Sequence, residues 1–401
     1  MSLAAGQSIT ILLKQQIRAV AFGAAARRFF SLAPGVAFVN HGSYGAPPRS
    51  VQEEAERWRR CMEANPDRFM REVLPGALRK AAARLAKEFR TTENRMAFVE
   101  NATAAANTVL RSLDFRRGDE ILLNSHSYGA VRQAARYVAS RTGARIVEAA
   151  IALPVHSADE LVEAIRASFS RRTRLVVLDH IASPSGLIFP IHQLAAIARR
   201  HGAKVLVDGA HGPGQLPLDI PALGVDWYLG NCHKWLFAPR GCAFLWSRRR
   251  DVHPLAISHG YGKGYSEEFD WTGTRDFSPW LAVSAAITFS RAVEPRARRY
   301  RHELATKAAA LLSSALGETL DGPPDLHASM MAVRLPRVFD DAASLRMRLL
   351  ARHRVVAAIV PIEGRTWCRV SAQIYNTAAD YERLRDAILA EASRASRRSR
   401  G

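Results

Sequence analysis

Short apolar runs recur along the first two thirds of the chain, and segments long enough for a helix separate most of them. Uninterrupted apolar runs of this length are typical of strands that are buried on both faces. Strands that alternate with helices indicate βαβ units and a mostly parallel sheet, so the pattern predicts an α/β fold. The predicted strands are residues 97–99, 120–123, 145–148, 173–179, 204–208, 227–229 and 242–246.

The pattern changes after about residue 285. Residues 281–316 are rich in Ala, Leu and Arg and predict long helices, and short strands and helices then alternate up to Ala392. A chain of 401 residues with 48% hydrophobic residues can bury one large core and a smaller one. We therefore expect a large domain over residues 34–285, in which segment 34–50 contributes to the substrate side, and a smaller α+β domain over residues 286–401.

Residues 1–33 are expected to form an N-terminal extension. The first 35 residues carry Lys14, Arg18, Arg27 and Arg28 but no acidic residue, which is typical of an amphipathic organellar presequence. A bacterial N-terminal helix or an upstream start codon explains the same composition. We expect a cytoplasmic protein, with an organellar location if this segment is a presequence.

The apolar runs and the cysteines exclude two classes of protein. No run approaches the ~20 apolar residues that a spanning helix needs, so no membrane segment is expected. The cysteines form no C-x-x-C pair, which disfavours a disulfide framework and a zinc site, and no metal site is predicted. They are Cys61, Cys232, Cys242 and Cys368.

The net charge of +20 comes from 57 basic and 37 acidic residues. Such an excess occurs in proteins that bind nucleic acid or another anionic surface. Here the arginine clusters are scattered and carry few aromatic residues, so we interpret them as solvated surface and expect no nucleic-acid partner. A basic regulator that binds DNA or RNA remains the non-enzymatic alternative, although no helix-turn-helix is recognisable.

The segment Asn231-Cys232-His233-Lys234-Trp235 directly follows the predicted strand 227–229. This position places Lys234 in a loop at the carboxyl edge of the sheet, where open α/β sheets bind their ligands. A lone lysine is usually a solvated surface residue. The histidine, tryptophan and apolar residues around Lys234 instead form an environment that lowers the pKa of an amine and favours imine formation.

Asp208 ends the apolar strand 204–208 and is followed by Gly209, Ala210 and His211. A buried carboxylate must be paired, because an isolated buried charge costs many kcal/mol. Its partner is either a structural arginine or lysine or the cationic ring nitrogen of a cofactor. Pyridoxal 5′-phosphate (PLP) has such a nitrogen, and a facing carboxylate keeps it protonated so that the ring can accept electrons.

A third candidate lies where the predicted strand 97–99 enters a helix. Asn101-Ala102-Thr103 would present backbone N–H groups and a hydroxyl at a helix N-terminus, which suits a phosphate dianion. Ordinary capping of the helix by Thr103 explains the same residues. The segment becomes a phosphate site only together with Lys234 and Asp208.

The combined motifs resemble the class V aminotransferase family, which has the PLP-dependent transferase fold of type I, and within it the isopenicillin N epimerase-like branch. The similarity covers about residues 34–392 with the motifs in the same order. It is specific for fold and cofactor and much less so for the reaction. The segments that carry it are Phe38-Val39-Asn40-His41-Gly42-Ser43-Tyr44-Gly45, Glu100-Asn101-Ala102-Thr103, His126-Ser127-Tyr128-Gly129-Ala130, Asp208-Gly209-Ala210-His211, Gly230-Asn231-Cys232-His233-Lys234-Trp235 and Cys368-Arg369-Val370-Ser371.

The resemblance implies a role for each matching residue. Lys234 would hold PLP as a Schiff base, Asp208 would pair with the pyridine nitrogen, and His211 would reach the phenolic oxygen. Tyr128, or His126 behind it, would cover the ring, and Arg369 would bind the substrate carboxylate. The phosphate would be held by Ala102, Thr103, Asn231 and His233, with Thr274 donated across the interface of a homodimer, and Asn40 and His41 would line the substrate side.

The reaction stays open among several types of chemistry at the Cα of an amino acid. An epimerase or racemase acting on an amino-acid or peptide-like substrate is the first expectation, and a C–S lyase of the hercynylcysteine sulfoxide lyase type is the alternative. Transamination is a weaker possibility. Cysteine desulfurases of this family need a nucleophilic cysteine on a loop that precedes the carboxylate-binding arginine. Residues 351–365 contain no cysteine, and Cys368 sits directly beside Arg369, so a desulfurase is disfavoured.

Overall fold

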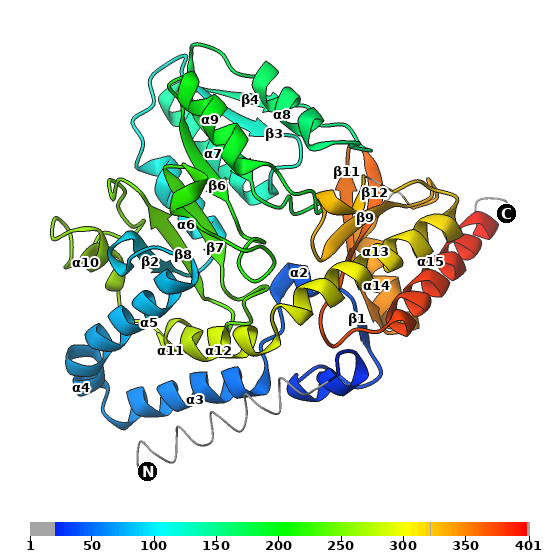
Figure 1. Cartoon of the computed structure of the whole chain (residues 1–401), viewed down its shortest axis with the longest axis horizontal. Helices are drawn as coiled ribbons and strands as arrows, with labels where there is room; N and C mark the ends of the chain where they lie inside the picture. Colours follow the sequence, from blue (N-terminus) through cyan, green and yellow to red (C-terminus); the bar gives the residue numbers. More distant parts are fainter. Residues whose placement is uncertain (1–20, 321, 340, 399–401) are drawn as a thin grey trace.

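The computed structural model describes residues 21–320, 322–339 and 341–398 (Figure 1). A seven-stranded sheet forms its centre, with the strand order β2-β8-β7-β6-β5-β3-β4. Strands β3 to β7 pair in parallel, whereas β8 runs antiparallel to both of its neighbours, β2 and β7. The predicted α/β fold with a mostly parallel sheet is confirmed. The strands are β2 (Met96–Val99), β3 (Glu120–Asn124), β4 (Arg145–Ala149), β5 (Thr173–Asp179), β6 (Lys204–Asp208), β7 (Trp227–Asn231) and β8 (Ala243–Ser247).

Helices cover both faces of this sheet (Figure 1). Alternate residues of a strand point to opposite faces, so Val176 packs into one apolar core and its neighbour Val177 into the other. The core of Val177 includes residues of α6 (Ala102–Arg111) and α7 (Gly129–Thr142). The core of Val176 includes α5 (Leu74–Glu88), α8 (Ala158–Ala167), α9 (Ile191–Arg200) and α12 (Val283–Val293).

The stretch of residues 281–316, for which long helices are predicted, is helical and is divided by two breaks. It consists of α11 (Ser278–Leu281), α12 and α13 (Arg296–Leu316). The last break falls at Glu294, whose backbone is extended, directly before Pro295. Proline lacks the N–H that a helix interior needs and disfavours the helical conformation of the residue before it, so the break is a local effect of this residue.

A second, three-stranded antiparallel sheet with the order β11-β12-β9 follows in the sequence. It has its own apolar core, which it shares with α13, α14 and α15 (Figure 1). This part agrees with the predicted mixture of short strands and helices. Its elements are β9 (Met330–Arg334), α14 (Ala342–His353), β10 (Val355–Val356), β11 (Ala358–Ile362), β12 (Arg365–Ser371) and α15 (Ala378–Arg398).

The N-terminal segment joins the two sheets. Strand β1 (Ala37–Phe38) pairs in parallel with β10, and α2 (His41–Tyr44) and α3 (Arg49–Ala64) then lead toward the large sheet. The remaining helices of this region are α4 (Pro66–Arg68), the π-helical turn η2 (Phe69–Val73) and α10 (Tyr265–Asp270). Short 3-10 turns are η1 (Ala24–Phe29), η3 (Glu93–Arg95), η4 (Pro221–Leu223) and η5 (Pro324–Leu326).

Of the predicted extension over residues 1–33, the first twenty residues lie outside the described ones. The described remainder packs into the molecule: Ala26 and Phe30 are buried, and the Phe30 ring contacts Phe237, Phe289 and Tyr375. This stretch therefore contributes to the main core. Within the described ranges, every helix is too short or too polar to cross a membrane.

Candidate active site

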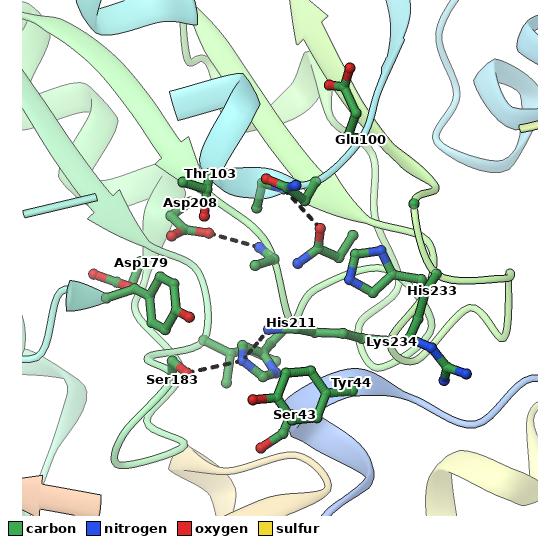
Figure 2. A pocket seen from close by; sticks show the side chains of 18 residues that line it. Ser43, Tyr44, Glu100, Thr103, Asp179, Ser183, Asp208, His211, His233 and Lys234 are labelled. Carbon is green, nitrogen blue, oxygen red and sulfur yellow. Dashed lines mark hydrogen bonds between the residues drawn. The ribbon is translucent and has the colours of Figure 1, made fainter. Parts of the chain in front are cut away.

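A cavity of about 320 Å³ opens at the carboxyl ends of β5, β6 and β7, beside the N-terminus of α6 (Figure 2). This is the edge at which open α/β sheets bind their ligands. Most of the site residues predicted from the sequence meet there. Those that line the cavity are Ala102, Thr103, Tyr128, Asp208, His211, Asn231, His233 and Lys234.

The Lys234 side chain is buried in this cavity, and its Nζ lies 3.0 Å from Nε2 of His211. Burial lowers the pKa of the amine to about 7, because the charged form loses its hydration, and the nearby charge of Arg369 acts in the same direction. The carboxylate of Asp208 opposes this shift. Lys234 therefore has a large neutral, nucleophilic fraction near pH 7.

The partner of Lys234 supports the neutral form. The indole N–H of Trp235 donates to Nδ1 of His211 at 3.2 Å, and burial holds the pKa of His211 well below its usual value. A neutral imidazole whose Nδ1 accepts a hydrogen bond carries its proton on Nε2. The Nε2–H therefore lies within reach of both the Lys234 amine, at 3.0 Å, and the Ser183 hydroxyl, at 3.3 Å. An amine with a free lone pair fits this position better than an ammonium.

Asp208 lies at the end of β6 and is 4% exposed. One carboxylate oxygen accepts the backbone N–H of Ala210 at 2.9 Å. Burial raises the pKa of Asp208, and the Ala210 hydrogen bond and the charge of Lys234 offset part of this rise. A second cation against the carboxylate would stabilise its charged form, and a protonated pyridine nitrogen is such a cation.

The N-terminus of α6 forms the end of the cavity that is suited to a phosphate group, called here the phosphate end. The first N–H groups of a helix have no acceptor within the helix. The N–H of Ala104 is taken by the Asn101 side chain and that of Ala102 by Oδ1 of Asn231, both at 2.9 Å. The Thr103 N–H is left for an anion. Asn231 thus acts here through the backbone of Ala102.

His233 lies beside this helix end, where its Nδ1 donates to the carbonyl of Cys242 at 3.1 Å. Burial and the charge of Lys234 lower the pKa of His233 to about 4, so the free ring is neutral. A phosphate dianion in contact with it would favour the protonated ring and so raise its pKa. The residues of this end therefore fit the phosphate of PLP.

Arg369 of β12 approaches the cavity without lining it. Its guanidinium donates to the Ser183 carbonyl and to the side chains of Asn40 and Ser43, at 3.3 and 3.2 Å for the last two. Ser43 and Ser183 line the cavity. Burial lowers the pKa of Arg369 to about 10, yet its Nε–H has no partner among the described residues. A buried cation with a spare donor suits a carboxylate ligand.

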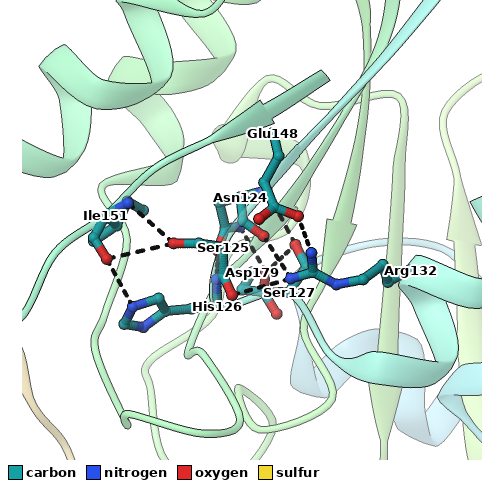
Figure 3. A network of polar contacts seen from close by, with 8 residues as sticks. All are labelled: Asn124, Ser125, His126, Ser127, Arg132, Glu148, Ile151 and Asp179. Atoms are coloured by element: carbon teal, nitrogen blue, oxygen red, sulfur yellow. Dashed lines mark hydrogen bonds and ion pairs between the residues drawn. The ribbon is translucent and has the colours of Figure 1, made fainter. Parts of the chain in front are cut away.

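Besides Arg369, four predicted residues lie outside the cavity lining. Asn40 is one of them, and its Oδ1 accepts from Arg369 and from the Ser43 hydroxyl, at 3.3 and 2.7 Å. His41 is buried and contacts the Tyr375 hydroxyl and the Lys234 carbonyl, at 2.9 and 3.0 Å, so it supports the lysine loop from behind. His126 contacts the Ser185 hydroxyl at 2.9 Å. It also contacts the Ile151 carbonyl at 3.0 Å (Figure 3), and it thereby anchors its own loop. Thr274 borders a separate cavity.

Several lining residues were missed by the sequence analysis. They include Ser43, Tyr44, Glu100, Asp179, Ser183 and Arg240. Asp179 carried a usable signal, because it ends an apolar strand with a carboxylate in the same way as Asp208 does. Ser183 and Arg240 lie in loops, and no sequence pattern indicated their direction.

Cys368 neighbours Arg369 but is fully buried in β12. Burial raises the pKa of its thiol to about 12, which leaves almost no thiolate at neutral pH. A nucleophilic role for Cys368 is therefore disfavoured, as the sequence predicted. No group of His, Cys, Asp and Glu among the described residues is arranged to hold a metal ion.

Comparisons with known proteins agree with this geometry. The family model described as Aminotransferase class-V matches residues 48–384. Isopenicillin N epimerase of Streptomyces clavuligerus is 36% identical, over 92% of this chain and 98% of its own. Putative L-cysteine desulfhydrase 1 of Oryza sativa subsp. japonica is also 36% identical, over 88% of this chain and 83% of its own.

A solved structure of a C-DES variant, with glycine covalently linked to its PLP cofactor, superimposes with a TM-score of 0.74 at 21% identity. The match covers 90% of this chain and 98% of that chain, and it supports the fold of type I. The extent of the family match and the identity to the relatives decide the assignment. This chain belongs to the class V aminotransferase family and is a PLP-dependent enzyme.

Proposed function

We propose that this enzyme is a C–S lyase that acts on cysteine or a small cysteine derivative. One cysteine and one water would give one pyruvate, one ammonia and one hydrogen sulfide. The Cα–H and Cβ–S bonds break, and the sulfur leaves with the bonding electrons and takes up a proton. The observation that carries the proposal is the single amine of Lys234, neutral in large part near pH 7, in a cavity of about 320 Å³.

Bound PLP supplies an electron sink for the charge that develops at the substrate Cα. Lys234 would hold the cofactor and, once released, remove the Cα proton. His211 keeps the amine oriented through its contact at 3.0 Å. Asp208 would face the ring nitrogen, and Arg369 would hold the α-carboxylate, so that the scissile bonds have a fixed direction.

The size of the cavity favours a small substrate. Pockets for drug-sized ligands span roughly 300–1,000 Å³, and this cavity must hold both PLP and the substrate. A cysteine-sized amino acid suits that space better than a peptide. The name of the rice relative, an L-cysteine desulfhydrase, supports the same substrate class.

Epimerisation at Cα is the second candidate. The actinomycete epimerase matches over 98% of its length, more than the rice relative does. Epimerisation needs a second proton donor on the other side of Cα, in addition to Lys234. Tyr128, whose side chain lines the cavity, would be that donor.

One experiment separates the two reactions. Holoenzyme is mixed with L-cysteine in deuterium oxide, and sulfide, pyruvate and the configuration and deuterium content of recovered cysteine are measured. The lyase predicts sulfide and pyruvate in equal amounts. Deuterated D-cysteine without sulfide would refute it and support an epimerase. Lys234→Ala is the control, and it should abolish both.

We further propose a homodimer with shared active sites. Thr274 borders a cavity formed with Trp271, His259 and Met70, away from Lys234 of its own chain. In a dimer its hydroxyl would reach the phosphate of the neighbouring subunit. Analytical ultracentrifugation at the absorbance of the bound cofactor tests this, because a monomer with full PLP occupancy would contradict it.

We propose a cytoplasmic location. All four cysteines are free thiols, and three of them are buried, which fits a reducing compartment. One plant relative carries the name of a chloroplastic L-cysteine desulfhydrase, so an organellar location is the alternative. Fractionation of the source cells with antibody detection distinguishes the two.

A further inference from the structure

Two carboxyl groups stand side by side at the edge of the sheet. Asp179 ends β5 and Asp208 ends β6, and the two residues are direct partners in the parallel register. They are 2% and 4% exposed. Side chains at partnered positions of parallel strands point to the same face, so both carboxyl groups face the cavity that they line. The proposed reaction uses Asp208 and leaves Asp179 without a role.

Asp179 makes its hydrogen bonds to the loop between β3 and α7 (Figure 3). Its Oδ2 accepts from Nδ2 of Asn124 at 2.8 Å and from the Ser127 hydroxyl at 3.1 Å. Oδ1 of Asn124 in turn accepts the backbone N–H of His126 at 2.9 Å. One buried carboxyl group thus binds two side chains of this short segment, which His126 and Arg132 hold as well.

The loop ends at Tyr128, which precedes the first residue of α7 and lines the cavity. The Tyr128 side chain is 47% exposed and interacts electrostatically with Arg369. The direction of this half-exposed ring therefore depends on the backbone of residues 124–128, which Asp179 helps to hold through Asn124 and Ser127.

We propose that Asp179 is a positioning residue that helps to hold the loop of residues 124–128 so that Tyr128 covers one face of the ring of the bound cofactor. Offset stacking on an aromatic ring contributes about 0.5–1.5 kcal/mol beyond the burial of area, which makes cofactor affinity sensitive to the placement of Tyr128. The inference rests on the proposed place of Tyr128 and not on the lyase reaction.

The charges around Asp179 are compatible with this role. Burial raises the pKa of Asp179 to about 8, with the negative charge of Asp208 as the second cause, while Asn124, Ser127 and the nearby Arg132 lower it. Two adjacent buried carboxylates disfavour a double charge. A proton on Asp179 leaves the single charge on Asp208, where a ring cation needs it.

A double-mutant cycle on cofactor affinity tests the proposal. PLP is titrated into cofactor-free protein, and its dissociation constant and visible circular dichroism are measured for Asp179→Ala, Tyr128→Ala and the combination. We expect Asp179→Ala to weaken PLP binding about tenfold, in line with the stacking contribution. In the Tyr128→Ala background the same change should add less than about threefold, because the ring that Asp179 positions is absent.

Two conservative variants sharpen the test. Asp179→Asn keeps an oxygen that can accept both hydrogen bonds, and it should bind PLP like the wild type. Ser127→Ala removes one of the two donors with little risk to folding. It should weaken PLP binding when Tyr128 is present and have no such effect in the Tyr128→Ala variant. Asp119→Ala is the matched control: this carboxylate accepts the N–H of Arg116 and pairs with Arg174 near the amino end of β3, away from the cavity.

Two outcomes would overturn the proposal. Additive effects of Asp179→Ala, or of Ser127→Ala, with Tyr128→Ala would show that the carboxyl group acts independently of the ring. An Asp179→Asn variant that binds PLP as weakly as Asp179→Ala would show that the hydrogen bonds are not the cause. Because the measurement is cofactor binding, a failure to release sulfide from cysteine would refute the lyase and leave this test unaffected.

Discussion

The indole N–H of Trp235 donates a hydrogen bond to Nδ1 of His211, the same imidazole whose Nε2 lies 3.0 Å from Nζ of Lys234. A residue adjacent to the lysine in sequence thus fixes the protonation of the group that faces it. The proton on Nε2 disfavours an ammonium at Lys234, in the same direction as burial. The reactivity of Lys234 therefore depends on the Trp235 indole, which acts on the amine through His211.

Covalent capture of PLP should follow the neutral form of Lys234. The pKa of about 7 implies that the reactive fraction rises as the pH increases through 7 and levels off above about 8.5. PLP is added to cofactor-free protein between pH 5.5 and 9, fixed with borohydride and quantified by mass spectrometry. A midpoint near 10, the value of an ordinary lysine, would contradict the prediction.

Trp235→Phe should move that midpoint to higher pH. Without the indole donor, His211 can place its proton on Nδ1 and offer the Nε2 lone pair to an ammonium, which stabilises charged Lys234. The pH series of PLP capture measures the shift. Trp227→Phe is the matched control, since Trp227 is equally buried and its N–H has no acceptor among the described residues. Equal midpoints in both variants would exclude the tautomer argument.

Arg369→Gln should raise KM for an amino acid by roughly 10–100-fold, because a hydrogen bond to a charged group contributes about 1.5–3 kcal/mol. The kcat should change less, and the bound PLP should remain, since Arg369 does not line the phosphate end. Steady-state kinetics with the absorbance of the cofactor provide both values. Arg365→Gln, on the same strand and outside the cavity, should leave KM unchanged. A loss confined to kcat would remove Arg369 from carboxylate binding.

Phe30→Ala should destabilise the protein by about 3–5 kcal/mol, because a buried phenyl group leaves a cavity. Phe30 is 2% exposed and packs between Phe237, Phe289 and Tyr375. Urea denaturation measures the change in the free energy of unfolding. The exposed Arg28→Ala variant should lie within about 0.5 kcal/mol of the wild type. A Phe30→Ala variant of unchanged stability would show that this segment is dispensable.

The sequence predicts the large sheet well because its strands are buried on both faces. Apolar runs such as residues 173–179 are then sufficient to predict the strands. The same rule places Asp208 and Lys234 at one edge, since parallel strands end together. The direction of β8 is not contained in its own residues, because it depends on how the loop of residues 232–242 returns along β7.

The sequence is less informative where a side chain depends on distant partners. His41 and His126 were expected at the ligand, yet their rings contact Tyr375 and Ser185, which lie far along the chain. A histidine in a loop can point either way, and long-range packing decides. Asp179 was missed for the opposite reason. Like Asp208 it is a carboxylate that ends an apolar strand, but only one carboxylate is needed to pair with the single ring nitrogen, and Asp208 was assigned to that role.

The parallel pairing of β1 with β10 makes folding of the N-terminal segment wait for the end of synthesis. Asn40 and its partner Arg369 lie 329 positions apart, so at 5–20 residues per second the ribosome takes roughly 15–65 s to make the second after the first. Throughout that interval the nascent chain holds β1 and α2 without the strands that fix them. The large sheet can fold and meet PLP earlier, while the substrate side closes only when β12 has emerged.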